Sequence, residues 1–548
     1  MTSSVFAAEH LLFNPATPDH GDIPLIFAFP NEYTVGITSL GYQIVWATLA
    51  MRADLQVSRL FTDISEQLPR QPEIVGFSVS WELDYVNILS LLESLDIPIR
   101  TNARGANHPI IFGGGPVLTA NPEPFADFFD VILLGDGENL LGDFIDAYKQ
   151  VRGADREIVL KALAQVPGVY VPSLYHVEYY SLDGAIKSIQ PIKPDVPATV
   201  QKQTYRGNTL SASTVVTEKA AWESIFMVEV VRSCPEMCRF CLASYLTLPF
   251  RTASLENSLI PAIERGLKVT NRLGLLGASV TQHPEFNTLL DYINQPKYDD
   301  VRLSIASVRT NTVTKELAAT LAKRDTKSLT IAVESGSQRV RKIINKKLEQ
   351  DDIIQAAVNA KAGGLSGLKL YGMVGVPGEE PEDLDATVKM MLDLKKAAPG
   401  LRLTLGCSTF VPKAHTPFQW FGVNKQAEKR LQLLQKNLKP KGIDFRPESY
   451  NWSIIQALLS RGDRRLSKLL ELTRDFGDSL GSYKRAFKEL RGQIPDLEFY
   501  VYDKWAHDQV LPWNHLLGPL PQSTLLKHLA EAMSYVEAPS KKLEPSGV

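Results

Sequence analysis

Three cysteines stand close together near the middle of the chain, in the segment SCPEMCRFCLASY: Cys234, Cys238 and Cys241. Their spacing places three thiolates on one tight loop. Three thiolates can bind three irons of a cubane iron–sulfur cluster and leave the fourth iron without a protein ligand. An open coordination site is what a Lewis-basic molecule needs in order to be bound and activated by a metal.

A zinc site and a chance grouping are the alternatives to an open cluster. Structural zinc normally takes four ligands, commonly from paired C-x2-C units. The only other cysteine, Cys407, stands far along the chain within a predicted strand, where a free cysteine is usually an ordinary core residue. The motif therefore favours the cluster, and four cysteines grouped in this way do not resemble a disulfide framework.

The composition is that of a globular protein with several domains. The chain has 548 residues, 44% of them hydrophobic and 22% charged, which is too long for a single core. With 59 basic and 61 acidic residues, no general attraction to nucleic acid or to an anionic membrane is expected. No signal peptide and no apolar run of about 20 residues is present, so we expect a cytoplasmic protein.

The first part of the chain, residues 1–154, predicts a doubly wound α/β domain. Short apolar runs (PLIFAFP, EIVGFSVS, PIIFGGGP and DVILLGDGE) alternate with helical patterns, as in parallel sheets. Small or polar residues stand at the ends of these runs, where such sheets bind their ligands. The candidate binding residues of this domain are Ser78, Gly113, Gly114, Gly115 and Gly135.

The rest of the chain predicts a linker, a barrel and a helical domain. Residues 155–218 are a β-rich linker, and residues 219–424 contain six strand–helix repeats. Six repeats suggest a partial (β/α)6 barrel of the TIM type, in which catalytic groups lie at the carboxyl ends of the strands. The cysteines follow the first of these strands. Residues 425–548 form a mostly helical carboxyl-terminal domain.

The cysteine motif, with the aromatic Phe240 before its last cysteine, resembles the signature of the radical S-adenosylmethionine (SAM) superfamily. The resemblance implies a [4Fe–4S] cluster held by Cys234, Cys238 and Cys241, whose bare iron binds SAM. It also implies reductive cleavage of SAM to a 5′-deoxyadenosyl radical, with a flavodoxin or a ferredoxin as the electron donor.

Later segments resemble the same superfamily in the same order: LLGASVTQHPEF, LSIASVRTNTV, LTIAVESGSQRVRKIINK and LKLYGMVGVPGEEPEDL. The resemblance implies contacts with SAM at Phe240, Ser279, Ser304, Glu334 and Val376. The stretch Gly277-Ala278-Ser279 departs from the usual Gly-Gly-Glu, so the amino group of SAM is expected to meet backbone carbonyls there. No residue is assigned a catalytic role.

The amino-terminal domain resembles the cobalamin-binding domain of B12-dependent radical SAM enzymes, through segments such as FPNEYTVGITSLGYQIVWATL and IIFGGGPVLTANPEPFADFFDVILLGDGE. A glycine-rich loop beside a helix terminus suits the phosphate tail of a corrinoid, which makes cobalamin a candidate third cofactor. The D-x-H-x-x-G motif is absent, so no cobalt ligand is named. The chain as a whole resembles a family of B12-binding radical SAM proteins whose motifs say little about the substrate.

The resemblance implies hydrogen abstraction, with cobalamin-dependent C-methylation as the expected outcome. The alternatives are a radical rearrangement or cyclisation, RNA modification without cobalamin, and a non-catalytic Fe–S or zinc protein that serves as a scaffold or sensor. RNA modification is less favoured, because the chain lacks the extra amino-terminal cysteines of the methylthiotransferases.

Three further sets of residues have two interpretations each. The basic residues Arg461, Arg464, Arg465 and Lys468 suggest a salt-bridged helix face rather than an RNA site. His415 suggests an anchoring hydrogen bond rather than a substrate contact. For His283, a SAM-facing position and a plain loop position are left open.

Overall fold

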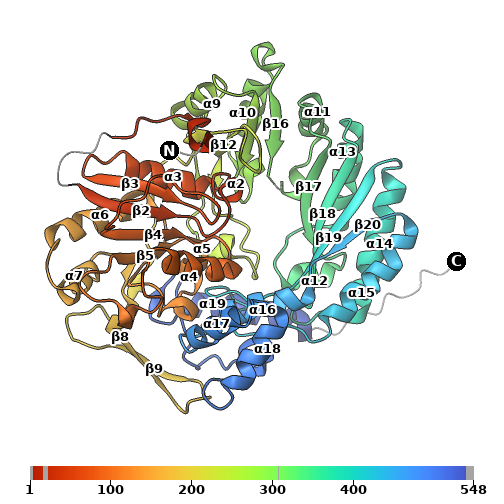
Figure 1. The fold of residues 1–548 in the computed structure, drawn as a ribbon. Coiled ribbons are helices and arrows are strands. Elements are labelled where there is room, and N and C mark those ends of the chain that lie inside the picture. Colours follow the sequence, from red (N-terminus) through yellow and green to blue (C-terminus); the bar gives the residue numbers. More distant parts are fainter. Residues whose placement is uncertain (1–3, 17–21, 307, 538–548) are drawn as a thin grey trace.

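A computed structural model of the chain describes residues 4–16, 22–306 and 308–537. The amino-terminal domain is built on a six-stranded sheet (Figure 1). Its strands, in spatial order, are β3 (Leu55–Leu60), β2 (Ile23–Ala28), β4 (Ile74–Ser78), β5 (Ile110–Gly114), β6 (Val131–Leu133) and β7 (Val169–Tyr170). The first five strands are parallel and β7 is antiparallel. This order is that of a flavodoxin-like doubly wound fold, which confirms the α/β prediction.

Strand β3 is absent from the sequence-based prediction, and a buried charge explains why. The strand LQVSRL contains Arg59, whose side chain is 3% exposed. Its guanidinium pairs with Glu9 at 2.8 Å and with Glu66 at 2.7 Å. A sequence pattern treats arginine as a surface residue, whereas here two carboxylates from other parts of the chain satisfy it in the interior.

The linker contains the expected antiparallel hairpin of β8 (Tyr175–Tyr179) and β9 (Ile186–Pro191). It leads to the partial barrel, whose strands are all parallel to their neighbours. The first sheet of the barrel has the order β12 (Ile225–Glu229), β15 (Arg272–Leu276) and β16 (Arg302–Ile305). The second has the order β17 (Ser328–Glu334), β18 (Gly367–Val374), β19 (Arg402–Thr409) and β20 (Asp444–Pro447).

Among the residues that the structure describes, one bridge, Val308 to Ile331, joins the two sheets of the barrel. Helices cover the outer face: α9 (Ile260–Gly266), α10 (Phe286–Ile293), α11 (Lys315–Lys323), α13 (Gln350–Ala362), α14 (Pro381–Ala397) and α15 (Ala427–Leu438). The six predicted strands are present, and β20 adds a seventh. The barrel is therefore partial, and its two halves are weakly connected.

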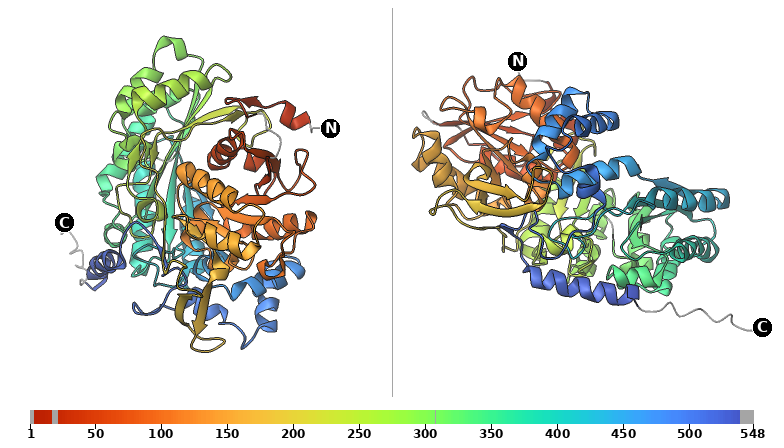
Figure 2. Two further views of the ribbon diagram at one scale, coloured as in Figure 1. Left: turned by 90° about the vertical axis from the view of Figure 1, so that its left-hand side faces the viewer. Right: turned by 90° about the horizontal axis from the view of Figure 1, so that it is seen from below.

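The helices after residue 425 do not pack as one separate body. Helix α15 joins the core of the barrel. Three helices pack into the same hydrophobic core as the amino-terminal sheet: α16 (Tyr450–Arg461), α17 (Leu466–Asp475) and α18 (Leu480–Glu489). Helix α19 (Gln522–Glu537) packs instead on α12 (Gln338–Ile343). Figure 2 shows these blue helices lying against both the red sheet and the green barrel.

Arg461 and Arg464, at the end of α16 and just before α17, hold segments of the chain together rather than facing solvent, whereas Lys468 of α17 is exposed. Arg464 pairs with Glu123 of the amino-terminal domain at 2.9 Å, and Glu123 is 1% exposed. Arg461 is fully buried and donates to the backbone carbonyls of Tyr500 and Asp503. This arrangement agrees with the ion-paired interpretation of the cluster, extended here from a helix face to a domain junction.

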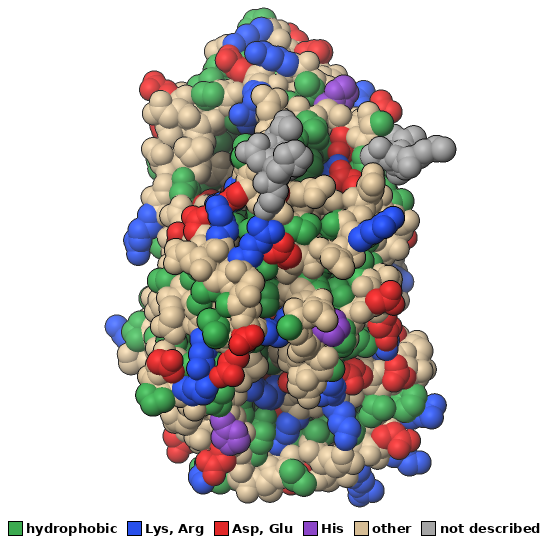
Figure 3. Space-filling model, turned by 60° about the vertical axis from the view of Figure 1, so that its left-hand side comes forward, with side chains coloured by type: hydrophobic (Ala, Val, Ile, Leu, Met, Phe, Trp, Pro, Cys, Tyr) green, Lys and Arg blue, Asp and Glu red, His purple; other side chains and the backbone are tan. Residues whose placement is uncertain are grey.

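The face in Figure 3 carries blue and red side chains in an interspersed pattern, as the near-neutral net charge implies. None of the helices in the described part of the chain is both long and apolar enough to cross a membrane.

Candidate functional site

The cysteines lie on a tight loop that follows the first barrel strand. Strand β12 ends at Glu229, and α8 (Leu242–Tyr245) begins directly after the last cysteine. Ser233 and Met237 adopt positive φ angles of 70° and 56°, which turn the loop sharply. The hydroxyl of Ser233 donates to the carbonyl of Ala243 at 2.9 Å and closes the loop.

The end of α12 fixes this loop from behind. The side-chain amide of Asn345 donates to the carbonyl of Met237 at 2.9 Å. The guanidinium of Arg239 donates to the carbonyls of Lys342 and Ile343, both at 2.9 Å. These bonds satisfy the carbonyl groups left open at a helix end. They also hold the cysteines in place relative to β17, the strand that precedes α12.

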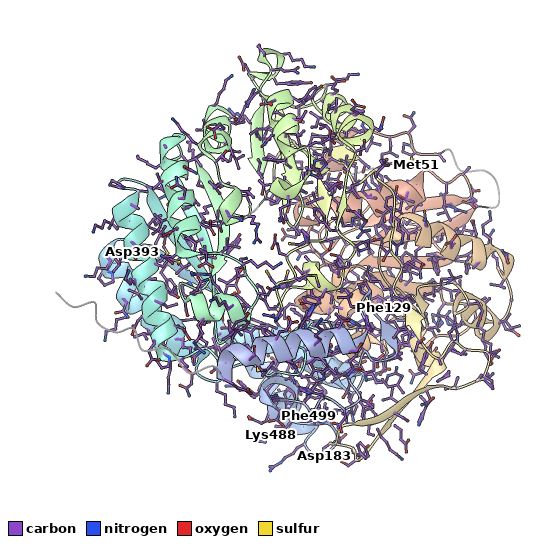
Figure 4. The ribbon with its side chains drawn as sticks, turned by 180° about the vertical axis from the view of Figure 1, so that it is seen from behind. Met51, Phe129, Asp183, Asp393, Lys488 and Phe499 are labelled. Carbon is purple, nitrogen blue, oxygen red and sulfur yellow. The ribbon has the colours of Figure 1, made fainter. Side chains whose placement is uncertain are left out.

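Helix α19 covers the other side of the cysteine loop. His528 Nδ1 lies 2.8 Å from the hydroxyl of Tyr245, and Glu531 pairs with Arg239 at 3.1 Å. Figure 4, seen from behind, shows α19 running between the side of the barrel that carries Asp393 and the side of the molecule that carries Phe129. Two helices from distant parts of the chain therefore enclose the loop.

The three cysteines line one cavity of about 180 Å³. It is formed at the carboxyl ends of the strands in both halves of the barrel. The other residues of its wall are Glu236, Phe240, Ser244, Ala278, Ser279, Val308, Arg309, Ala332, Glu334 and Lys346.

Three of the five predicted SAM contacts reach this cavity and two do not. Phe240, Ser279 and Glu334 line it. Ser304 is exposed on β16 and lies outside the wall, and Val376 is buried in the hydrophobic cluster beneath α19. A side chain at the end of a strand can face the cavity or the core, and the motif does not distinguish between them.

Two ion pairs in the wall were not anticipated from the sequence. Lys346 pairs with Glu334 at 3.0 Å, and Arg309 pairs with Glu236 at 3.1 Å. All four side chains are at most 13% exposed. Lys346 ends the quoted segment LTIAVESGSQRVRKIINK, but only the fold shows that it turns back toward Glu334. The wall therefore offers two cations and two anions beside the cysteines.

The backbone of Glu334 is strained at this point. Its φ angle is +64°, and the pairing of β17 with β18 shifts register between Ala332 and Glu334. A left-handed residue other than glycine costs roughly 1–3 kcal/mol and is common at functional sites. Burial lowers the pKa of Lys346, but the Glu334 carboxylate outweighs it, so the lysine pKa is raised overall.

Cys238 is buried, Cys234 and Cys241 are partly exposed, and the three thiols are electrostatically coupled. Burial raises the pKa of Cys238 to about 12, with Cys241 and Cys234 adding to the shift and Lys346 opposing it. Metal binding must therefore displace protons from these thiols. Within the described ranges, no three His, Cys, Asp or Glu side chains converge on one ion. A cubane binds each thiolate at a different iron, so a tripod of soft sulfur donors fits such a group.

A second cavity, of about 220 Å³, lies at the carboxyl ends of β4, β5 and β6, between α3 (Leu40–Ala50) and α6 (Gly137–Gln150). Of the residues predicted for this domain, Ser78, Gly114, Gly115 and Gly135 line it. Gly113 does not line the cavity. A Cβ there would lie 2.5 Å from Leu118 and 2.7 Å from Phe129, so this glycine serves core packing.

Gly115 and Gly135 are required by the backbone itself. Their φ angles are +114° and +110°. An added Cβ would lie 2.4 Å from the carbonyl oxygen of Val79 or 2.1 Å from that of Gln203. No larger residue fits either position without moving the strand ends.

Charged side chains connect the second cavity to the cysteine loop. Arg232, two residues before Cys234, lines the second cavity and pairs with Glu138 of α6 at 2.6 Å. It also approaches Asp136, which pairs with Arg251 at 2.5 Å. Burial raises the pKa of Asp136, but Arg232 and Arg251 outweigh it, so the pKa is lowered overall. The amino-terminal domain therefore meets the cysteine-bearing strand through ion pairs.

Cys407 and His283 occupy structural positions, whereas His415 borders a cavity. Cys407 is 2% exposed in the barrel core, and burial raises its pKa far above the ordinary value. His283 Nε2 lies 2.7 Å from the carbonyl of Ala253, and the residue is outside the cysteine cavity. His415 donates its backbone N–H to Gln419 at 2.9 Å, and its ring borders a third cavity of about 450 Å³ with Trp513 and Asn514.

Two protein-family models match the chain. One, described as the amino-terminal region of radical SAM proteins, covers residues 43–172, and the other, described as the radical SAM superfamily, covers residues 228–391. Between them they include the cysteine loop and the amino-terminal sheet apart from β2, which precedes residue 43, and they end before the carboxyl-terminal helices.

Individual proteins are similar over much of the length. The chain is 29% identical to the uncharacterized protein MJ0966 of Methanocaldococcus jannaschii, over 83% of this chain and 93% of that one. It is 22% identical to the uncharacterized methyltransferase PH0819 of Pyrococcus horikoshii, over 60% and 66%. Among solved structures, the radical SAM methyltransferase TsrM of Kitasatospora setae aligns with a TM-score of 0.49 at 14% identity, covering 73% of this chain and 77% of TsrM.

Proposed function

The chain belongs to the radical SAM superfamily, and on that basis we propose that it is a cobalamin-dependent radical SAM enzyme that methylates a carbon atom of its substrate. The cofactors of this superfamily are a [4Fe–4S] cluster and SAM. The observation that carries the proposal is the single cavity that brings three cysteines together with two buried ion pairs at the carboxyl ends of the barrel strands.

Cys234, Cys238 and Cys241 would hold the cluster. A bound and reduced cluster would supply the electron for the reductive cleavage of SAM. The protein contributes a rigid loop, because α12 and α19 fix it from two sides. It also contributes a small cavity, which would hold the reacting groups together and limit side reactions. A flavodoxin or ferredoxin would deliver the electron.

The charged wall of the cavity matches the amino-acid part of SAM. SAM carries an ammonium and a carboxylate, and the wall carries Glu334 and Glu236 together with Lys346 and Arg309. We propose Glu334 as the partner of the ammonium, and Lys346 or Arg309 as the partner of the carboxylate. Phe240 and Ser279 would complete the site from the cysteine loop and from β15. Preformed ion pairs orient such a ligand with little reorganisation.

The second cavity is the proposed corrinoid site. Its wall is largely apolar, and Gly114, Gly115 and Gly135 allow a ligand to approach the backbone closely. A partly apolar cavity at strand ends suits the nucleotide tail of cobalamin. Arg232 borders both this cavity and the cysteine loop, which supports a reaction that uses both sites. The similarity to a protein named as a methyltransferase supports methylation as the outcome.

Anaerobic reconstitution tests the proposal. Protein reconstituted with iron, sulfide and cobalamin is reduced by dithionite in the presence of SAM. We expect 5′-deoxyadenosine to form with the parent chain and with the matched control Cys407→Ala, and to vanish with Cys238→Ala. We also expect about one corrinoid per chain, and S-adenosylhomocysteine as a second product.

Each failure points to a different alternative. A chain that forms 5′-deoxyadenosine but binds no corrinoid and yields no S-adenosylhomocysteine catalyses a rearrangement or cyclisation. A chain that binds iron or zinc but leaves SAM intact is a scaffold or sensor. Either result overturns the methylase proposal.

A further inference from the structure

The inner face of the second barrel sheet is exposed. In a closed barrel the interior is filled by bulky aliphatic side chains. On β18, Leu368 and Leu370 are fully buried toward the covering helices, whereas the alternate residues Lys369 and Tyr371 are exposed. Tyr371 is 51% exposed, although it sits in the middle of a sheet. Side chains along a strand alternate between faces, so the open face is the concave one.

This open face begins beside the cysteine cavity. Tyr371 pairs with Ala332 of the neighbouring strand, and Ala332 lines that cavity. Lys369 lies two residues further from the cavity, which is about 7 Å along the strand. A molecule resting on Tyr371 would therefore lie next to the space assigned to SAM.

Two cations on this face form no ion pair in the described part of the chain, although Arg402 lies near enough to Asp444 to help lower the pKa of that carboxyl. The Nε atom of Arg402, at the start of β19, lies 3.8 Å from the position of a Cβ on Gly367, so its side chain crosses the same face. Neither Arg402 nor Lys369 forms an ion pair with any residue the structure describes. Arg446, on β20, is by contrast paired with Asp444 at 2.7 Å. Arg402 lies on the neighbouring strand β19, two residues further from the cavity than Lys369. It is therefore about 14 Å from Tyr371.

The ring of Tyr371 is uncovered because its neighbour is glycine. Gly406 pairs with Tyr371 across β18 and β19. A Cβ at Gly406 would lie 3.6 Å from the Tyr371 ring, so the ring leans over the glycine. The hydroxyl of Tyr371 has no hydrogen-bond partner in the described part of the chain. The ring therefore presents a flat aromatic surface on the exposed face.

We propose that this face binds the substrate, and that the substrate is a small molecule with a flat unsaturated ring and one or two anionic groups. The ring stacks on Tyr371 beside the cysteine cavity, and the anionic groups pair with Lys369 and Arg402, about 7 and 14 Å away. This inference rests on the proposed function, because the cavity is the reaction centre only if SAM is cleaved there. The anion is a phosphate or a carboxylate, since both pair with lysine and arginine.

A large nucleic acid does not match this face. RNA-binding surfaces neutralise several phosphates with clustered lysine and arginine and follow an extended basic surface. Here two cations, Lys369 and Arg402, form no ion pair with the described residues, and the net charge of the chain is −2. The cations are confined to one strip of the inner sheet face.

Calorimetric titration of the reconstituted, SAM-saturated protein tests the inference with matched probes. Guanosine 5′-monophosphate is compared with guanosine and with ribose 5-phosphate, and indole-3-acetate is compared with indole-3-acetamide. We expect at least one anionic ring compound to bind tenfold or more tightly than its neutral counterpart, and ribose 5-phosphate to bind weakly. The nucleotide comparison tests for recognition of a phosphate, and the indole comparison tests for recognition of a carboxylate.

Single variants test whether the probes bind to this face of the sheet. The affinity for the preferred probe should fall at least fivefold in each of Lys369→Met, Arg402→Gln and Tyr371→Leu. Tyr371→Phe should restore the affinity lost in Tyr371→Leu. Lys389→Met, on the outer helix α14 and 77% exposed, is the control and should bind as the parent does. Equal affinity for charged and neutral probes, or no effect of the three variants, overturns the inference. So does tRNA binding with a steep salt dependence that the same variants abolish.

The result is separable from the proposed function. The same preparations are assayed for 5′-deoxyadenosine. Probe binding without SAM cleavage overturns the function alone, and SAM cleavage without selective probe binding overturns this inference alone.

Discussion

Glu334 and Lys346 show how single residues define the candidate site. Each is 12% exposed, and each satisfies the other's charge beside the buried thiols. Removing one partner of a buried pair leaves the other charge unpaired in a medium of low dielectric constant. The pair therefore contributes to folding as well as to the proposed binding of SAM.

Replacing Lys346 by methionine should destabilise the protein strongly. Glu334 would remain buried without its partner, so we expect the free energy of unfolding to fall by about 3–5 kcal/mol. Urea denaturation measures the loss. The double variant Lys346→Met/Glu334→Gln should recover most of it.

Lys347→Met is the matched control for this prediction. Lys347 is 52% exposed and lies 3.6 Å from Glu236, so its removal should cost less than about 1 kcal/mol. Equal losses for the two lysine variants would contradict the buried-pair argument.

The sequence reveals the cysteines but not the ion pairs around them. Metal-ligand spacing is local, so Cys234, Cys238 and Cys241 can be recognised without knowledge of the fold. Arg309 and Lys346 meet Glu236 and Glu334 only after distant strands assemble. The motif also could not separate Ser279, which lines the cavity, from Ser304, which does not.

At the scale of elements, strand ends and the loops after them form both cavities. The alternation of apolar runs with helical patterns was sufficient to predict the parallel sheets, because the strand period is local. It missed β3, whose Arg59 is neutralised by residues outside the strand, and it missed β20 at the edge of the barrel. A strand with polar residues is not recognised from the sequence pattern when the partners of those residues lie elsewhere in the chain.

Gly115→Ala should impair the second cavity without affecting the cluster. The added Cβ meets the backbone of Val79 at 2.4 Å in a conformation unfavourable for alanine, so the loop must move. We expect cobalamin affinity to fall at least tenfold while the iron content per chain stays at the parental level. Absorbance titration with hydroxocobalamin and iron analysis measure the two quantities.

Gly105→Ala provides the comparison, because a Cβ there meets nothing within 4 Å. It should bind cobalamin as the parent does. Parental affinity in Gly115→Ala would place the corrinoid elsewhere.

At the scale of the whole molecule, buried polar groups join segments that are far apart in the sequence. Glu123 accepts from Arg464, 341 residues later, and also from the hydroxyl of Tyr170. His515 packs against Tyr170 and Tyr175 in the same junction. No local pattern indicates that the helices after residue 425 divide among three hydrophobic clusters, because each helix is amphipathic whichever partner it covers.

Arg464→Met should destabilise this junction. Glu123 would be left buried without its cation, and we expect a loss of about 3–5 kcal/mol in the free energy of unfolding, measured by urea denaturation. Arg464→Met/Glu123→Gln should be milder. Lys468→Met, one turn further along α17 and bonded only to the exposed Gln493, should change the stability by less than about 0.5 kcal/mol.

Stability should fall as the solution becomes acidic, partly through His515. Burial lowers the pKa of His515 to about 4, against about 6.5 in the unfolded chain. Between these two pH values the unfolded chain binds the proton and the folded chain does not, so stability declines from about pH 6.5 to pH 4 and levels off below. The linkage is worth about 3 kcal/mol, an order-of-magnitude figure.

His515→Phe isolates this contribution. The difference in unfolding free energy between parent and variant should shrink by that amount between pH 7 and pH 4. His176→Gln, on the exposed hairpin, should follow the parental curve. A pH-independent difference for His515→Phe would contradict the assignment.

Helix α19 covers the cysteine loop but is synthesised later than the loop. His528 stands 283 residues after Tyr245, so a ribosome that adds roughly 5–20 residues per second reaches it about 15–60 s later. During that interval the nascent chain already carries its thiols, while the helix that encloses them has not been synthesised. An iron–sulfur carrier can reach the loop then from a side that the finished protein closes.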